Sequence, residues 1–292
     1  MPKGIYKRNP EQITRVFIIA EAGKNFIRKE VELSTEEYLF NAKKLAKIAK
    51  EAGSSSIKFQ THELDELPKR DQKRKEWIER NIRATPREFW EKLQAYCEEI
   101  EIEFMSTPMS KGAAQKLFGL VKRWKVASPD VVDRELVEYL LQTNLPIIAS
   151  TGMSFEYEIN DFVSLFLKEY DLTLLHCKSI YPCPIDRLNL KAMETLKKYG
   201  YKVGFSDHTD SLTLPAVAVG MGASVIEKHF TLDKDDWGPD HAICLEPDEF
   251  KEMVQNIREA ELSLGTGELF VDTLEEDKRK IFRMGYLKNF KK

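Results

Sequence analysis

Long hydrophobic runs are missing from this sequence of 292 residues, and their absence excludes several classes of protein. A membrane-spanning helix needs about twenty consecutive apolar residues, and no stretch of the chain approaches this length. The first ten residues contain no apolar core segment of the kind found in a secretory signal peptide. We therefore expect no membrane span and no export.

Cysteine is scarce, and its spacing excludes the common cysteine-based metal and redox motifs. No C-x-x-C pair occurs among the cysteines, which are Cys97, Cys177, Cys183 and Cys244. We expect a reduced, cytoplasmic setting, in which disulfides are rare. Cys177 and Cys183 flank a motif described below, and we interpret them as packing residues.

An excess of one charge is absent too. Lysine and arginine total 45 against 48 aspartate and glutamate residues, which gives a net charge of −3. Proteins that bind nucleic acid or anionic membranes usually carry a basic excess, so we expect neither as a partner. A near-neutral total still permits a local basic pocket for a small anion.

The chain does contain a regular alternation of strand-like and helix-like segments. Short apolar runs predict strands at 16–23, 56–62, 103–108, 124–128, 146–152, 172–177, 201–206 and 224–230. Ser34 and Glu37 have the spacing of a capping box, and Thr85-Pro86 predicts a second helix start with Pro86 at the first helical position. Further predicted helices include 111–123, 131–142, 189–199, 212–221 and 247–263. About eight strand–helix units in roughly 250 residues predict an α/β protein with a (β/α)8 TIM barrel.

No Pro/Gly/Ser-rich boundary divides the chain. We expect a single barrel domain over residues 1–264, followed by a short C-terminal helical tail over 265–292 with a helix at about 274–284. The charged stretch at 63–83 is interpreted as a long strand-to-helix loop that carries a helix of its own.

Polar side chains follow the predicted strands at their C-terminal ends, where TIM barrels place their active sites. Lys58 lies between Ile57 and Phe59, and a lysine buried in a strand needs an anionic partner. Lys125 occupies a similar place in another strand. Together with nearby hydroxyls, the two lysines predict a site for a compact anion carrying phosphate or carboxylate groups. Any single Ser or Thr at these positions can also be explained without a function, because strand ends contact solvent and are often polar.

Two motifs late in the chain each place a polar residue two positions before a histidine. Ser206 precedes His208, and Glu227 precedes His229. Residues i and i+2 of a strand share a face, so both pairs can point into one pocket. His208 and His229 are therefore candidate ligands of a divalent metal, although the same spacing also suits structural histidines.

Nine ordered motifs, spanning about residues 16 to 264, resemble the sialic acid synthase family, which makes N-acetylneuraminic, legionaminic and pseudaminic acids. They are Ile18-Ile-Ala-Glu-Ala-Gly23, Ile57-Lys-Phe-Gln-Thr61, Ser106-Thr-Pro108, Lys125-Val-Ala-Ser128, Ser150-Thr-Gly-Met153, Leu175-His-Cys177 with Tyr181-Pro182, Gly204-Phe-Ser-Asp-His-Thr209, Glu227-Lys-His-Phe-Thr-Leu-Asp233 and Gly238-Pro-Asp-His241.

This resemblance implies a transferase that condenses phosphoenolpyruvate with the open-chain aldehyde of an N-acetylated amino sugar. The products would be a 3-deoxy-2-ulosonic acid and phosphate, and the cofactor a divalent metal, often manganese, with magnesium as the alternative. His208 and His229 would hold the metal. The groups that would hold phosphoenolpyruvate are Lys58, Lys125, Thr107, Ser128, Ser150 and Ser206. Glu21 would handle protons around the attacking water, Gln60 would support metal and substrate, and the sugar would face Asp130, Ser179, Tyr181 and Asp240.

Three departures from the family pattern concern the acceptor. Asn25 is followed by Phe26, Ile27 and Arg28 where the family has a histidine and then Asn-Gly, which would alter the substrate pocket. Lys178 replaces a usual threonine and adds positive charge near the sugar position. The family's C-terminal antifreeze-like domain would begin about where the chain ends. Three alternatives stay open: a naturally short member with the barrel alone, a piece of a longer protein, or a site completed by a second copy in a homodimer or by a separate capping chain.

Other functions remain compatible with these residues. The acceptor can be a non-amino or phosphorylated aldose. The barrel can be a binding protein, or a subunit with little activity without its partner. An aldolase that forms a Schiff base on Lys58 or Lys125 is a third reading.

Overall fold

A computed structural model describes residues 15–28, 30–63 and 75–283. The part of the charged stretch at 64–74 and the end of the predicted tail helix at residue 284 lie outside the described residues. No helix within residues 15–28, 30–63 and 75–283 is long and apolar enough to cross a membrane.

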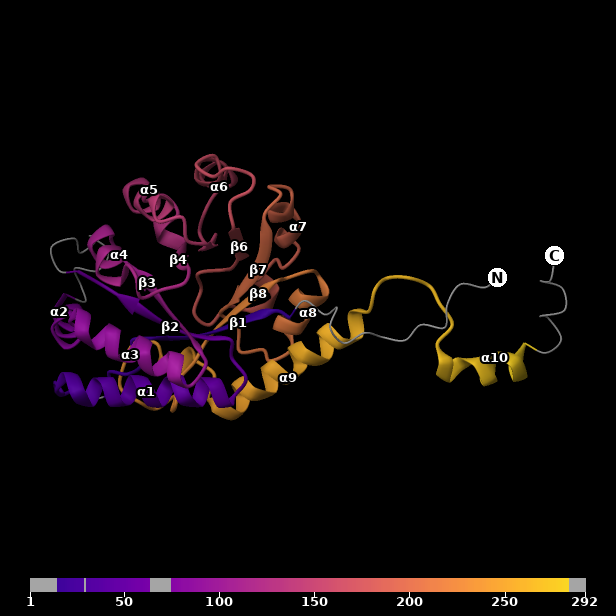
Figure 1. Cartoon of the computed structure of the whole chain (residues 1–292), viewed down its shortest axis with the longest axis horizontal. Coiled ribbons are helices and arrows are strands. Elements are labelled where there is room, and N and C mark those ends of the chain that lie inside the picture. The colour runs from indigo at the N-terminus through magenta and orange to yellow at the C-terminus, as the bar shows by residue number, and fades with distance from the viewer. Residues whose placement is uncertain (1–14, 29, 64–74, 284–292) are drawn as a thin grey trace.

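Eight parallel strands form the centre of the molecule (Figure 1). They are β1 (Phe17–Gly23), β2 (Ser56–Thr61), β3 (Glu103–Pro108), β4 (Trp124–Val126), β5 (Ile147–Ser150), β6 (Leu172–His176), β7 (Lys202–Asp207) and β8 (Val225–His229). Their order in the sheet is β3-β2-β1-β8-β7-β6-β5-β4. The two end strands of this order, β3 and β4, lie in contact, so the sheet curves round into a barrel. The predicted (β/α)8 barrel is confirmed.

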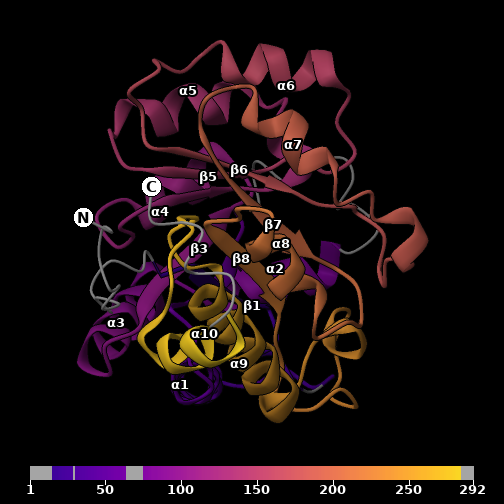
Figure 2. The ribbon, with the colours of Figure 1, turned by 90° about the vertical axis from the view of Figure 1, so that its right-hand side faces the viewer.

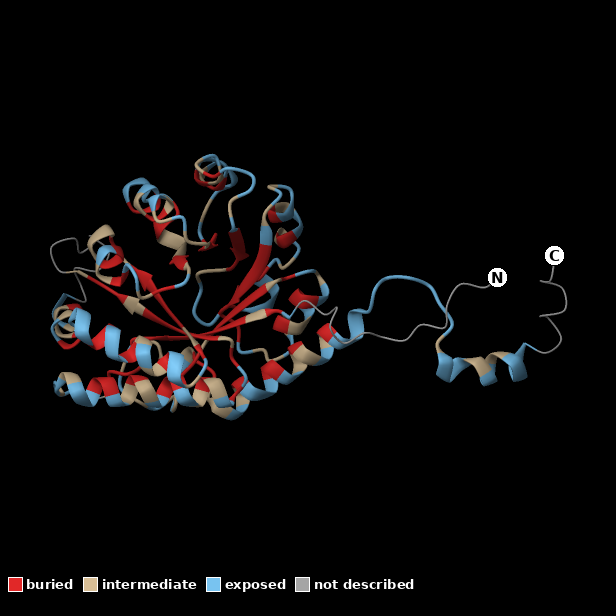
Figure 3. Cartoon of the chain, in the orientation of Figure 1, coloured by how far each residue is buried: buried red, intermediate tan, exposed pale blue. Residues whose placement is uncertain are grey.

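The helices form a ring outside the strands, seen from two directions in Figures 1 and 2. They are α1 (Thr35–Glu51), α2 (Lys75–Ala84), α3 (Arg87–Glu99), α4 (Lys111–Leu117), α5 (Arg134–Gln142), α6 (Glu156–Val163), α7 (Ala192–Lys197), α8 (Leu214–Gly220) and α9 (Pro247–Leu264). In Figure 3 the buried residues of these helices lie mainly on the side next to the strands, and the exposed residues lie on the outer side. This one-sided burial is typical of helices that pack on a central sheet.

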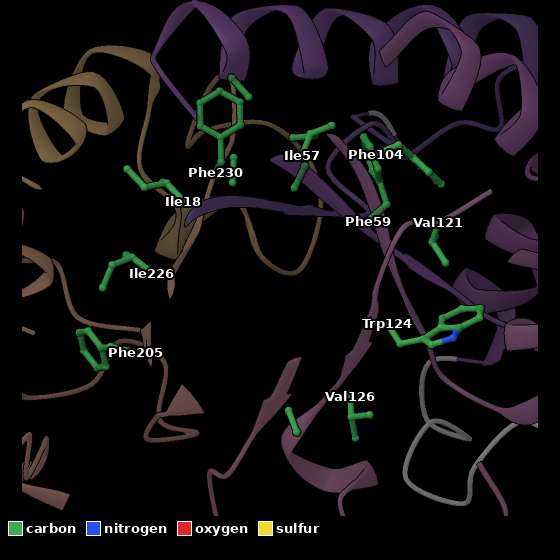
Figure 4. Close-up of a cluster of buried hydrophobic side chains, with 14 of the residues drawn as sticks. Ile18, Ile57, Phe59, Phe104, Val121, Trp124, Val126, Phe205, Ile226 and Phe230 are labelled. Atoms are coloured by element: carbon green, nitrogen blue, oxygen red, sulfur yellow. The ribbon is translucent and has the colours of Figure 1, made fainter. Parts of the chain in front are cut away.

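Apolar side chains fill the barrel on both sides of the strands. The larger cluster lies between strands and helices and includes Ile18, Ile57 and Phe205 (Figure 4). A smaller cluster lies inside the barrel and consists of Ile19, Met105, Ile148, Leu175 and Val225, which we call the plug. Successive strand residues face opposite sides, which explains why Ile18 and Ile19 belong to different clusters.

The plug determines where polar side chains can gather. The residue two positions after each plug residue faces the same interior, one layer nearer the C-terminal ends of the strands. These positions are occupied by Glu21, Thr107, Ser150, Cys177 and Glu227. On β1, β3, β5 and β8 the barrel interior therefore changes from an apolar layer to a polar one within two residues.

Several helix boundaries differ from the predicted ones. The predicted helix 111–123 ends at Leu117, because the chain turns at Gly119, whose φ is +84°. Pro86 is the N-cap of α3 and not its first residue. Thr85 does not cap α3, because its hydroxyl donates to the carbonyl of Asn81 at the end of α2, 2.7 Å away. The capping box of α1 is confirmed, since Ser34 accepts from the Glu37 backbone.

Residues 265–283 follow α9 and extend away from the barrel (Figure 1). They contain a 3₁₀ turn (Thr273–Glu275) and α10 (Glu276–Phe282), which together correspond to the predicted tail helix. Most side chains in this segment are exposed (Figure 3). It makes no contribution to the cavity described below.

Candidate active site

A cavity of about 390 Å³ opens at the C-terminal ends of the strands, directly above the plug. Strand residues form its floor, and the loops after β6 and β8 contribute Tyr181 and Asp240 at its rim. All predicted site residues except Asp130 and Ser179 line it. They are Glu21, Lys58, Gln60, Thr107, Lys125, Ser128, Ser150, Tyr181, Ser206, His208, His229 and Asp240.

Lys58 lies at the centre of the first group of contacts. Its Nζ is 2.5 Å from Glu21 Oε2 and 3.6 Å from Glu227 Oε2, and it donates to Thr107 Oγ1 at 3.0 Å. Burial alone lowers the pKa of the Lys58 amine, but the two carboxylates outweigh it and hold that pKa above its ordinary value. Lys58 is therefore a permanent cation, and the anionic partner that the sequence required is present.

Lys125 forms a second group on the other side of the cavity. Its Nζ donates to Ser150 Oγ at 2.7 Å and to the Val126 carbonyl at 2.9 Å, and it lies 3.9 Å from Glu227 Oε2. Burial lowers the pKa of Lys125, and the opposing effect of Glu227 does not outweigh it. The two lysines thus share one carboxylate but differ in how firmly they hold their protons.

Glu227 is the residue that connects both groups, and the sequence analysis assigned it no role. Ser206 Oγ donates to its Oε1 at 3.0 Å, while its Oε2 faces both lysines. Burial raises the pKa of Glu227, but Lys125 and Lys58 lower it more strongly, to about 2. Its spacing from His229 was the available signal, because residues two apart on a strand share a face.

His208 and His229 face one another, with ring centroids 5.4 Å apart. His208 Nδ1 donates to the Lys178 carbonyl at 2.7 Å, which leaves Nε2 as the nitrogen with the lone pair. Burial, reinforced by the neighbouring His229, lowers the pKa of His208 to about 4. Burial also lowers the pKa of His229, whose Nδ1 is buried and finds no hydrogen-bond partner among the described residues. Both imidazoles are therefore neutral at pH 7.

Two neutral imidazoles side by side fit a divalent metal ion. Across residues 15–28, 30–63 and 75–283, no group of three or more His, Cys, Asp or Glu side chains has a metal-binding arrangement. The protein therefore offers a pair of nitrogen ligands, and further ligands would come from bound oxygen groups. The unpartnered Nδ1 of His229 shows that this ring is not committed to a structural hydrogen bond.

Gln60 and Asp240 both line the cavity and both approach Gly23. Gln60 Nε2 donates to Glu21 Oε1 at 2.9 Å. A Cβ at Gly23 would lie 3.3 Å from Gln60 Nε2 and 3.5 Å from Asp240 Oδ2. Gly23 also has φ of +51°, which a side chain disfavours. The glycine therefore allows both side chains to converge beside Glu21.

Asp130 and Ser179 are outside the cavity lining. Asp130 is buried in the 3₁₀ turn Ser128–Asp130, whose first residue does line the cavity. Ser179 Oγ is buried next to Gly152, where an added Cβ would approach it to 2.5 Å. A motif match places a residue in the chain order, but it does not determine the direction of the side chain.

The departures at 26–28 and at Lys178 also lie outside the lining. Phe26 is fully buried and packs edge-on against Tyr38 and Trp90 beneath β1, so it belongs to the core. Arg28 forms an ion pair with Asp236. Lys178 contributes its backbone carbonyl to His208. The expectation that the substitutions after Asn25 reshape the pocket is therefore not supported by the placement of Phe26 or Arg28.

Comparison with known proteins gives one consistent result. The model of the NeuB family matches residues 45–269. An uncharacterised protein of Methanocaldococcus jannaschii is 41% identical over 267 residues, covering 89% of this chain and 75% of the relative. The N,N'-diacetyllegionaminic acid synthase of Legionella pneumophila is 39% identical over 273 residues, covering 86% of this chain and 74% of the relative.

A solved structure agrees with these sequence matches. The N-acetylneuraminic acid synthetase of Leptospira borgpetersenii, crystallised with citrate, superposes with a TM-score of 0.81 at 31% identity. The match covers 94% of this chain and 93% of that chain. With the family model matching most of the barrel and relatives well above 30% identity, the chain belongs to the NeuB family and is an enzyme of the transferase type.

Proposed function

We propose that this enzyme condenses phosphoenolpyruvate with the open-chain aldehyde of an N-acyl amino sugar. The products are a 3-deoxy-2-ulosonic acid of the sialic acid type and phosphate. One observation carries the proposal: two buried lysines converge on Glu227 in the same cavity that holds a pair of neutral histidines. The relatives, named as legionaminic and pseudaminic acid synthases, support the substrate class.

The lysine end of the cavity suits phosphoenolpyruvate. Lys58 and Lys125 provide two cations, and the nearby hydroxyls of Thr107, Ser128 and Ser150 donate hydrogen bonds to phosphate or carboxylate oxygens. Because the lysines are already hydrogen-bonded and buried, they need little reorganisation when an anion binds. Such preorganisation favours a transition state in which charge moves between fixed groups.

Glu21 and Glu227 take different parts because their proton affinities diverge. Burial and the neighbouring Glu227 raise the pKa of Glu21 in spite of Lys58, whereas the pKa of Glu227 falls to about 2. Two carboxyls with separated pKa values are a frequent sign of separate acid–base and electrostatic roles. We assign proton transfer to Glu21 and the fixed negative charge to Glu227.

The histidine end suits the sugar aldehyde. A divalent cation held by His208 and His229, in our proposal manganese with magnesium as the alternative, would polarise the aldehyde oxygen as a Lewis acid. Tyr181, whose ring centroid lies 4.3 Å from that of His208, and Asp240 would orient the sugar at the cavity mouth. Asp130 and Ser179 would act from behind this rim.

The reaction then follows from the order of groups in the cavity. The C2=C3 π electrons of phosphoenolpyruvate form the bond from C3 to the aldehyde carbon. Water adds to the electron-poor C2 and gives one proton to Glu21, which replaces the proton taken up by the aldehyde oxygen. The C2–O bond to phosphate then breaks, and the hydroxyl left on C2 loses its proton to the departing phosphate and becomes the ketone. Phosphate leaves between Lys58 and Lys125. Holding the two carbons in contact removes most of the entropic barrier to this step.

Phosphate release from phosphoenolpyruvate with manganese, measured across aldoses and N-acyl amino sugars, tests the proposal. We expect release that depends on the sugar and is lost in His208→Ala. The best acceptor identifies the substrate, including a non-amino or phosphorylated aldose. Bound phosphoenolpyruvate with no release for any sugar would contradict catalysis by this chain alone and would favour a barrel that needs a second copy or a capping chain.

Lys125 supports one alternative function. A buried amine with a lowered pKa can attack a carbonyl and form a Schiff base, as in class I aldolases. Borohydride reduction in the presence of a keto acid would trap such an adduct on Lys125. The synthase proposal expects no trapped adduct.

A further inference from the structure

A buried ion pair lies on the outer side of β7 and β8, behind the cavity. Lys228 Nζ is 2.6 Å from Asp207 Oδ2, and the side chains are 1% and 0% exposed. Lys228 separates Glu227 from His229 along β8, so its side chain faces away from both, toward the helix layer. Nothing in the proposed reaction uses this pair directly.

Lys228 also reaches the chain just beyond β7. Its Nζ donates to the Thr209 carbonyl and, at 3.4 Å, to the Ser211 carbonyl. Asp207 in turn accepts from the Thr209 backbone N–H at 2.9 Å. The backbone on both sides of His208 is thus tied to one ammonium group through Asp207 and Thr209.

The cavity side of His208 is held by a different segment. Its Nδ1 donates to the Lys178 carbonyl, and its own carbonyl accepts from the Cys183 N–H at 2.7 Å. These contacts fix the ring, but they belong to an exposed loop. Lys228 provides a fully buried contact from a strand, and the next residue on that strand is the second histidine.

We propose that Lys228 is a positioning residue that holds His208 opposite His229 for binding a divalent cation. The inference rests on the proposed function and assigns a role that none of the cavity residues supplies. A side chain that orients a metal ligand typically changes metal affinity about 10–100-fold when it is removed. A pair that only stabilises the fold would leave that affinity unchanged.

Manganese binding to the metal-free protein, measured by calorimetry, tests the inference. The variant is Asp207→Asn with Lys228→Met, which removes both charges together and leaves no unpaired buried ion. We expect its manganese affinity to fall at least about tenfold, while phosphoenolpyruvate binding without metal is retained. In turnover, the manganese concentration for half-maximal rate should rise, and kcat at saturating manganese should recover.

Glu261→Gln is the matched control. Glu261 is another buried carboxylate, which accepts from Val16 N at 2.5 Å and from Arg258 at 2.7 Å at the opposite end of the barrel. The Glu261→Gln variant should have a lower unfolding temperature and an unchanged manganese affinity. Lys228→Arg serves if the double variant does not fold, because it keeps a cation beside Asp207 but changes the donors to the Thr209 and Ser211 carbonyls, with an intermediate loss of affinity expected.

The outcomes separate this inference from the function on which it rests. Wild-type protein that neither binds manganese nor releases phosphate would contradict the proposed function. Wild-type binding together with equal manganese affinity in the double variant would overturn the role of Lys228 and leave the function intact. Equal losses of affinity in the double variant and in Glu261→Gln would show a general effect of stability, which also overturns it.

Discussion

Glu21 and Glu227 are two buried carboxylates that share contact with Lys58, yet their pKa values move in opposite directions. The difference arises because Glu227 also faces Lys125, while Glu21 faces only one lysine at close range. The pKa of a glutamate in this cavity therefore depends on how many lysines lie close to its carboxylate.

Replacing the two glutamates by glutamine should separate these roles. Glu227→Gln removes a permanent charge between two cations, and we expect it to lower the unfolding free energy by about 3 kcal/mol. Glu21→Gln should cost less stability, because Glu21 faces one lysine at close range whereas Glu227 faces two, while turnover is lost. Urea unfolding at pH 7 and phosphate release measure both effects. Equal stability losses would contradict the assignment.

His208 should make stability depend on pH below neutrality. Burial lowers the pKa of His208 in the folded protein to about 4, whereas an ordinary histidine has a pKa of 6.5, so between these pH values the unfolded chain binds a proton that the folded protein does not bind. Stability is therefore complete above about pH 6.5 and falls as the pH drops to 4, by up to about 3 kcal/mol. Unfolding titrations at several pH values measure the slope.

The variant His208→Asn provides the comparison for this pH effect. It keeps a side chain that can donate to the Lys178 carbonyl, but it does not titrate in this range. The slope between pH 7 and pH 4 should be smaller in the variant than in the wild-type protein. Identical slopes would mean that another group causes the acid sensitivity.

Sequence reasoning identified most cavity residues because their surroundings in the chain were informative. Lys58 and Lys125 lie within apolar strands, where a lysine needs an explanation. Glu227 was passed over because its partners come from three other strands, which the sequence does not bring together. Phe26 is close in sequence to cavity residues, but its side chain packs in the core and does not line the cavity.

At the scale of the elements, β7 depends on a close approach to its neighbours at Gly204. An added Cβ there would lie 2.4 Å from the Val225 carbonyl oxygen and 2.6 Å from Leu175 Cδ2. Both neighbours belong to the plug. The backbone of β8 cannot move aside without shifting Glu227 and His229, which follow Val225 on the same strand.

Gly204→Ala should therefore destabilise the barrel, by about 1–3 kcal/mol or more, and reduce turnover. Gly220→Ala is the matched control, because no atom lies within 4 Å of a Cβ added at the end of α8. The control should be neutral or slightly stabilising. Thermal unfolding of both variants measures the difference, and similar melting temperatures would contradict the close-approach argument.

Strands were easier to predict than helices. All eight strands are buried on both faces, so each reads as a compact apolar run. Helix ends are harder to predict because one side chain can serve either of two helices. The Thr85 hydroxyl donates to the Asn81 carbonyl in α2, so the N-cap of α3 is Pro86. The sequence around Thr85 does not show which of the two helices its hydroxyl will serve.

At the scale of the whole molecule, the barrel and the segment after α9 differ in burial. Residues 265–283 are mostly exposed, while the described strands are almost wholly buried (Figure 3). We propose that residues up to 264 form the synthase domain and that 265–292 form a tail outside it.

Ending the chain after Leu264 tests this division. The unfolding temperature should change little, because the described part of the tail contributes no side chain to the plug or the cavity. Circular dichroism during heating measures the fold, and phosphate release measures the site. A large drop in unfolding temperature would show that the tail is part of the domain. Retained stability with lost turnover would assign the tail a role at the site.

The plug also bears on the order in which molecules can enter the cavity. Among the described residues, Ile19, Met105, Ile148, Leu175 and Val225 fill the barrel interior below the cavity. The two lysines lie deep in the cavity, and Tyr181, which is 52% exposed, lies at its rim. We therefore propose an ordered reaction, in which the anion on the lysines binds before the sugar at the rim and is covered by it.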